Sequence, residues 1–187
     1  VAERLNEKGV PESGELERIS RLLGTAITQT RGVARGLFPV RLAEDGLASA
    51  LEEMAANTSQ LFQIPCRFVC EEAPESMDNA LALHLYYIAL EAVANAAKHG
   101  RAANILVSLK PAQKRYALTI EDDGAGFAVS DNTRLGMGLR IMQYRARVIG
   151  ASFDIASQPG KGTTITCLFV PAPQGDTKRF LNQPAQR

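Results

Sequence analysis

The chain has 187 residues, of which 45% are hydrophobic and 22% are charged, as expected of a globular protein with one sizeable domain. Its formal net charge of +1 provides no strong field for nucleic acid or a membrane surface, so we expect neither as a direct partner. No signal peptide opens the chain, and no apolar run approaches the length of a membrane span. These features predict a soluble, cytoplasmic piece, although its parent protein need not be soluble.

The cysteines give the same indication of compartment. Three of them, an odd number without a repeating spacing, argue against a disulfide framework and fit a reducing environment. Cys66 and Cys70 are four residues apart, but the chain has two histidines, both assigned to one predicted helix, which leaves little to complete a zinc site. We therefore interpret the cysteines as buried free thiols.

Residues 14–38 predict a long helix with a narrow apolar seam. The seam alternates intervals of three and four residues, which is an a/d pattern over about 25 residues, or roughly 37 Å of helix. Ser13 is a suitable N-cap and Pro39 ends the run. The seam residues are Leu16, Ile19, Leu23, Ala26, Thr30, Val33 and Leu37. Such a stripe favours a helical hairpin or a dimer bundle, with packing on the chain's own domain as the alternative. Residues 1–13 would be the tail of an earlier partner helix, most of which this sequence does not contain.

From residue 45 onward, the apolar periodicity predicts the order α, β, α, β, β, α, β, β. Asp45 would cap the N-terminus of the first of these helices. The second helix, which includes Tyr87–His99, would begin after the cap Asp78 and end at Gly100. The other elements are strands at 66–70, 104–110, 115–121, 152–157 and 163–170, and a helix at 136–150. The order indicates an α+β fold, a two-layer α/β sandwich with helices on one face of a mixed sheet.

These elements suggest three regions. We predict a partial helical region at 1–45, a globular domain at 46–171 and a loose, proline-broken tail at 172–187.

The stretch "EAVANAAKHG", residues 91–100, places polar side chains on an alanine-rich helix. Glu91, Asn95 and Lys98 share one face on a 3.6-residue period, with Tyr87 one turn earlier. The opposite stripe is apolar and consists of Leu81, Leu85, Ile88, Ala92 and Ala96. The plain interpretation is a surface helix with a short charged patch.

Three Gly-x-Gly elements follow this helix, at 124–126, 136–138 and 160–162. Glycine pairs alone mark any tight turn, so their setting decides what they indicate. The first follows a strand and two carboxylates in "IEDDGAG". The second opens a helix, where free backbone N–H groups and the helix dipole favour an anion such as a phosphate. The third could simply be a hairpin turn.

The four segments "EAVANAAKH", "EDDGAGF", "GMGL" and "GKGT" resemble the N box and the three glycine boxes of the ATPase superfamily that unites gyrase, Hsp90, histidine kinases and MutL. The match runs from about residue 64 to 170. Residues 26–55 resemble the second dimerisation helix and linker of sensor histidine kinases related to nitrate sensors. The resemblance implies a Bergerat-type ATP-binding fold attached to half of a helical dimerisation hairpin.

The resemblance also implies roles for the polar helix. The side-chain oxygen of Asn95 would coordinate magnesium without adding another negative charge. Glu91 would hold a magnesium-bound or attacking water, which makes these two the catalytic candidates. Lys98 and His99 would lie near the phosphates, although cations in a last helical turn also suit the helix dipole.

The glycine boxes would supply the rest of the ATP site. Asp122 would accept a hydrogen bond from the adenine amino group, while Gly124 and Gly126 let the backbone pass close to the base. Thr163 would contribute a hydroxyl, and residues 127–135 would form a short lid over the triphosphate. The second glycine box would contribute Gly136, Met137, Gly138 and Leu139.

The sequence departs from the family pattern at four positions. Asp123 stands where asparagine is usual, and Ala151 replaces the second glycine of a common pair. Tyr87 and Leu90 occupy positions that are often polar in relatives. None of these changes removes an implied magnesium or adenine contact.

The phosphoacceptor histidine of the family is not identified in this chain. His84 and His99 both belong to the ATP-domain helix, and neither stands in the "HD" context that relatives place on the first bundle helix. The resemblance therefore implies an acceptor upstream of residue 1.

We expect the catalytic part of a sensor histidine kinase. It would transfer the γ-phosphoryl of Mg-ATP to the upstream histidine, support transfer to a response regulator, and dimerise through its N-terminal helices. The alternative is a non-catalytic ATP-binding or interaction module of the same superfamily. An ATP-hydrolysing clamp like Hsp90 or MutL fits the boxes but not the short lid or the seam helix.

Overall fold

The structure, a computed structural model, describes residues 42, 45–129 and 136–171. The chain divides into two compact units, Val1–Pro39 and Val40–Arg187, and all described residues belong to the second. Four predicted segments lie outside the described residues: the end of a partner helix at 1–13, the seam helix at 14–38, the lid residues 130–135 and the tail at 172–187. The predicted region boundaries at 45 and 171 therefore stay predictions.

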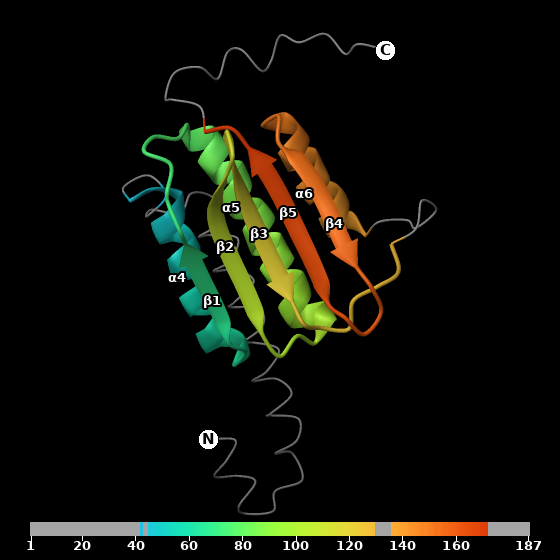
Figure 1. Cartoon of the computed structure of the whole chain (residues 1–187). Helices are drawn as coiled ribbons and strands as arrows, with labels where there is room; N and C mark the ends of the chain where they lie inside the picture. The colour runs from blue at the N-terminus through green and yellow to red at the C-terminus, as the bar shows by residue number, and fades with distance from the viewer. Residues whose placement is uncertain (1–41, 43–44, 130–135, 172–187) are drawn as a thin grey trace, which may run out of the picture. The chain divides into compact units, whose positions relative to one another are not determined.

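The described helices and strands follow the predicted order. They are α4 (Gly46–Phe62), β1 (Cys66–Cys70), α5 (Asn79–Asn95), the π-helical turn η1 (Ala96–Gly100), β2 (Ile105–Ala112), β3 (Arg115–Asp122), α6 (Met137–Val148), β4 (Ser152–Ser157) and β5 (Thr163–Phe169). The sheet order is β1-β2-β3-β5-β4, with β1 parallel to β2 and the other pairs antiparallel. The three helices cover one face of this sheet (Figure 1), which confirms the two-layer α+β sandwich.

The core lies between the sheet and α5. The predicted apolar stripe of α5 is fully buried, and it comprises Leu81, Leu85, Ile88, Ala92 and Ala96. Side chains from four strands oppose it in one register row of Val107, Ile120, Ile165 and Ile155. Burial of each such large aliphatic side chain contributes about 1.5–3 kcal/mol, so this layer is the main support of the domain.

Asp78 caps α5 as predicted. Its Oδ1 accepts hydrogen bonds from the amide of Ala80 at 2.8 Å and from that of Leu81 at 3.2 Å. These bonds satisfy amides of the first turn that have no acceptor within the helix.

The expectation that no apolar run reaches the length of a membrane span is wrong on length and composition alone. The 22-residue stretch Asn79–Gly100 is long and apolar enough to cross a membrane. Its apolar character has a different explanation here, because α5 packs against β3 and also contacts α4 and α6. A helix enclosed on several sides needs apolar residues around most of its circumference.

Two predicted helix ends differ in the structure. Asp45 occupies the N-cap position of α4 without a side-chain capping bond, because its backbone is αR (φ −114°, ψ −3°) rather than the usual extended conformation. The left-handed residue after η1 is Arg101 (φ 51°) rather than Gly100, and its amide donates to the carbonyl of Ala96. A π-helical turn is one residue longer than an α turn, which moves the end by one position.

The interpretation of the cysteines as buried free thiols is right for two of them. Cys66 and Cys167 are buried, and burial raises the pKa of their thiols to about 11 and about 12. Cys70 is free but partly exposed.

Candidate functional site

A polar row ends the apolar layer at one end of the sheet. Asp122, Thr163 and Ser157 are register partners on β3, β5 and β4, two residues beyond the apolar row on each strand. Because side chains two apart on a strand share a face, all three lie on the helix-covered face. The core therefore opens into a polar site at this end.

Asp122 is the half-buried carboxylate of this row. Its Oδ1 accepts a hydrogen bond from the amide of Gly124 at 2.9 Å. Burial raises the pKa of Asp122, while backbone hydrogen bonds from Gly124 and Thr163 oppose that rise. A carboxylate kept partly out of water here is a strong acceptor for a ligand donor.

The glycines of the first and third boxes lie at backbone contacts. A Cβ on Gly124 would overlap the carbonyl of Gly100, and the amide of Ala125 donates to that same carbonyl at 2.6 Å. Gly126 (φ 56°) faces the carbonyls of Gln158 and Gly162. The first glycine box therefore packs directly on the end of η1.

The second glycine box packs on Glu91 and Asn95. A Cβ on Gly138 would overlap Oε1 of Glu91 and would lie 3.3 Å from Nδ2 of Asn95. The structure thus brings Glu91, Asn95 and the N-terminus of α6 together. Within that box, Met137 is 80% exposed, whereas Leu139 is partly buried against the core.

Lys98 and His99 lie on η1, between Asn95 and Gly100. Both side chains are exposed. Single π-helical turns are frequent at functional sites, and this one joins the Asn95 end of α5 to the contact with the first glycine box. Both side chains are therefore accessible to an anionic ligand.

Asp123 has a structural role that explains the departure from asparagine. Its Oδ1 accepts from the amides of Ala103 at 2.7 Å and Asn104 at 2.8 Å, and its Oδ2 accepts from Nδ2 of Asn104 at 2.8 Å. Hydrogen bonds from Asn104 are the main cause that lowers the pKa of Asp123. Since all partners are donors, a carboxylate suits this position.

The departure at Ala151 has a simple backbone reason. The left-handed conformation of this turn falls on Gly150 (φ 66°), and Ala151 is not among the described residues with positive φ. The second position of the pair therefore does not require glycine.

Ser157 is a site residue that the sequence reasoning missed. Its Oγ accepts from the amide of Phe127 at 2.9 Å, donates to the carbonyl of Gly162 at 3.0 Å and lies 3.0 Å from Oγ1 of Thr163. Ser157 has a single hydroxyl proton, so when it donates to Gly162, Thr163 donates to Ser157 and keeps acceptor capacity. The strand alternation of "SFDIAS" indicated that Ser157 faces inward.

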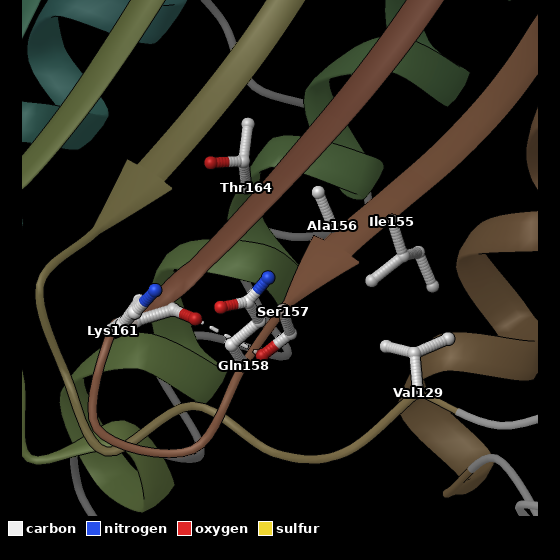
Figure 2. Close-up of a pocket in the computed structure, with 8 residues that line it drawn as sticks. Val129, Ile155, Ala156, Ser157, Gln158, Lys161 and Thr164 are labelled. Carbon is white, nitrogen blue, oxygen red and sulfur yellow. Dashed lines mark hydrogen bonds between the residues drawn. The ribbon is translucent and has the colours of Figure 1, made fainter.

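An open cavity of about 450 Å³ lies around the β4–β5 hairpin. Figure 2 shows Val129 and Ile155 at one side of the view and Lys161 at the other. Its lining includes Ser157 and Gly162 but no residue of α5 or α6. The candidate site is therefore defined by the converging side chains and glycines rather than by this cavity.

The fold and the site together define an α/β sandwich in which the polar stripe of a mainly apolar helix meets glycine-rich segments at one end of a mixed sheet. The sequence model of the family described as "Histidine kinase-, DNA gyrase B-, and HSP90-like ATPase" matches residues 80–174, just over half of the chain. The chain belongs to this family.

Among known proteins, the chain is 29% identical over 175 residues to the "Nitrate/nitrite sensor protein NarX" of Escherichia coli (strain K12), covering 90% of this chain and 29% of that protein. It is 31% identical over 150 residues to the "Sensor histidine kinase ComP" of Bacillus subtilis (strain 168), covering 79% and 20%. The first of these relatives is a nitrate/nitrite sensor by name and the second is a sensor histidine kinase by name, as the resemblance predicted. The chain spans less than a third of the length of either.

Solved structures show the same fold. The ATP binding domain of PrrB from Mycobacterium tuberculosis superposes with a TM-score of 0.53 at 21% identity, covering 68% of this chain and 95% of that one. The histidine kinase domain from the Erythrobacter litoralis EL346 blue-light activated histidine kinase gives a TM-score of 0.54 at 20% identity, covering 74% and 66%.

Proposed function

We propose that this chain binds ATP with magnesium as the catalytic domain of a sensor histidine kinase. The observation that carries the proposal is that two of the glycine-rich segments, 124–126 and 136–138, both contact residues 91–100, the C-terminal part of the helical stretch. Gly138 lies against Glu91 and Asn95, and Gly124 lies against Gly100 beside Asp122. A nucleotide at this place would have a carboxylate for its base at one side and a helix N-terminus for its phosphates at the other.

The N-terminus of α6 suits a triphosphate. The amide of Arg140 is bonded to the carbonyl of Gly136 at 3.2 Å, and the amides before it have no acceptor within the helix. Together with the helix dipole, these amides favour negative charge. Lys98 and His99, both exposed on η1, would add cationic or hydrogen-bonding groups on the same end of α5.

Magnesium fits the same residues. The carboxylate of Glu91 and a triphosphate would repel each other at the start of α6, unless a divalent cation lies between them. Asn95 offers a neutral oxygen next to that carboxylate. The described residues contain no group of three or more His, Cys, Asp or Glu side chains that could hold a metal. Magnesium commonly uses one or two protein ligands together with phosphate oxygens and water, and it would neutralise phosphate charge.

The adenine base would lie beside Asp122, whose carboxylate accepts from the exocyclic amino group. Gly124 and Gly126 have no side chains to block the base, and the hydroxyl of Thr163 would serve as an acceptor, directly or for a water. Met137 and Leu139 would contact the nucleotide through their backbone. The side chain of Met137 is exposed to solvent, and that of Leu139 packs against the core.

In the whole protein, the γ-phosphoryl would pass to a histidine outside this chain and then to a response regulator. Positioning and charge neutralisation would provide most of the catalysis. The names of the two relatives, a nitrate/nitrite sensor and a sensor histidine kinase, support this role. The proposal includes a cytoplasmic location and homodimerisation through the helix predicted at 14–38.

Substituting Asn95 by alanine tests the magnesium site. We expect calorimetry in magnesium to show about ten- to hundredfold weaker ATP binding, because a metal ligand is lost, and little change with excess EDTA. Asn57→Ala, on the exposed surface of α4, is the matched control and should bind like the unmodified chain. Equal affinities of Asn95→Ala and the unmodified chain in magnesium would remove Asn95 from the site.

Asp122 should select adenine over guanine. Its carboxylate can accept from the adenine amino group but would oppose the carbonyl oxygen of guanine, which leaves two buried acceptors facing each other. We expect ATP to compete at least about tenfold better than GTP, and Asp122→Ala to erase that preference. Asp154→Ala removes the same charge from an exposed position on β4 and should keep the preference. Equal competition by GTP against the unmodified chain would refute the assignment.

A further inference from the structure

Arg145 of α6 stacks on the ring of Tyr87 of α5. Its Cζ lies 4.4 Å from the ring centroid, within the range of a cation–π interaction. The guanidinium is charged at any physiological pH, so this attraction is permanent. Tyr86 packs edge-on against the same ring, with centroids 6.0 Å apart at 71°, which helps to fix its orientation.

This contact joins α6 to the polar stripe of α5, and so does the contact of Gly138 with Glu91 and Asn95. Arg145 comes seven residues later, about 10 Å along α6, and meets Tyr87, one turn before Glu91. A helix held at one point can pivot about it, whereas a second contact fixes its direction.

The helix α6 buries fewer side chains than the other two helices. It buries two residues, Met142 and Ala146, whereas α5 buries seven and α4 six. Four of its large apolar side chains are exposed: Met137, Ile141, Tyr144 and Val148. The stacking of Arg145 on Tyr87 therefore adds to packing that rests on few fully buried side chains.

His84 lies on the same stripe, one turn before Tyr87, and does not compete for the ring. Burial and the nearby charge of Arg145 lower the pKa of His84, which keeps it neutral near pH 7. Its buried Nδ1 has no hydrogen-bond partner among the described residues. The positive charge facing Tyr87 is therefore that of Arg145.

We propose that Tyr87 and Arg145 are positioning residues of the nucleotide site, which hold the N-terminus of α6 against Glu91 and Asn95. The predicted effect of these two residues on ATP binding rests on the proposed function. Their predicted effect on the position of α6 does not. The positioning role also gives a physical reason for an aromatic residue at position 87, because the ring is the surface on which Arg145 stacks.

The test combines nucleotide affinity with hydrogen exchange of residues 140–144 in the nucleotide-free chain, because the amide of Arg140 is the first that is bonded within α6. Tyr87→Leu and Arg145→Gln should each weaken Mg-ATP binding about two- to thirtyfold, because α6 is less often in the competent position. Both should also speed exchange at 140–144. Tyr87→Phe keeps the ring and should behave like the unmodified chain. The double variant should be no worse than either single one, since both remove the same interaction.

Tyr144→Leu and Arg147→Gln are matched controls, because both side chains are exposed on α6. They should change neither readout. Additive losses in the double variant, or weaker ATP binding with unchanged exchange, would overturn the positioning role. If Tyr87→Leu fails to fold, Arg145→Gln decides on its own. If the unmodified chain binds no ATP, the proposed function fails, while unchanged exchange in Arg145→Gln would separately refute the inference.

Discussion

Replacing Gly162 with alanine should destabilise this domain by about 2–5 kcal/mol. Gly162 has a left-handed backbone (φ 77°), which costs a residue with a side chain about 1–2 kcal/mol. A Cβ there would also overlap the carbonyl of Asp122 and lie 3.0 Å from Cα of Asp123. Both contacts are backbone, so relief requires β3 or the hairpin to move, and such overpacking typically costs about 1–3 kcal/mol.

Gly160→Ala is the matched control, because Gly160 has the same φ of 77° in the same hairpin but nothing within 4 Å of its Cβ position. It should lose only the backbone term, about 1–2 kcal/mol. Denaturant unfolding of both variants measures the difference. Equal losses would show that the close approach to Asp122 carries no energetic weight.

Local sequence patterns predicted most of the helices and strands, because the spacing of apolar side chains follows the period of each element. The apolar stripe of α5, the cap at Asp78 and the strands follow from side-chain spacing and capping chemistry, which act within a few residues. The contacts of Gly138 with Glu91, and of Gly124 with Gly100, join segments far apart in sequence. Periodicity does not encode such contacts, and only the resemblance to a family indicated that the boxes meet.

The features that the sequence did not reveal depend on tertiary contacts. The π-helical turn shifted the left-handed residue from Gly100 to Arg101, against the usual preference for glycine. Ser157 became a site residue through partners on two other segments, Phe127 on one and Gly162 with Thr163 on the other. The resemblance marked Tyr87 as an unusual residue. Its partner Arg145 lies 58 positions later, and no sequence motif or spacing pointed to it.

The unmodified chain should not phosphorylate itself when incubated with labelled ATP. It has two histidines, His84 and His99, and both belong to the helical stretch that lines the proposed site. In-line transfer needs the attacking nitrogen about 3–3.5 Å from the phosphorus. His84 lies seven residues before Glu91, about 10 Å along α5, and its Nδ1 is buried. His99 is exposed, but it is fixed on η1, and presenting it to the γ-phosphoryl would require unfolding that turn.

A longer protein that includes the sequence encoded upstream should instead carry one acid-labile phosphohistidine outside residues 1–187. The His84→Gln and His99→Gln variants of the longer protein should still be labelled at that histidine, because neither would be the acceptor. Stoichiometric label on residues 1–187, mapped by mass spectrometry to either histidine, would show that the acceptor has been misplaced. If the longer protein binds ATP but takes no label, the chain is a nucleotide-binding module without kinase activity, since binding requires the site alone whereas transfer also requires an acceptor held in line with it.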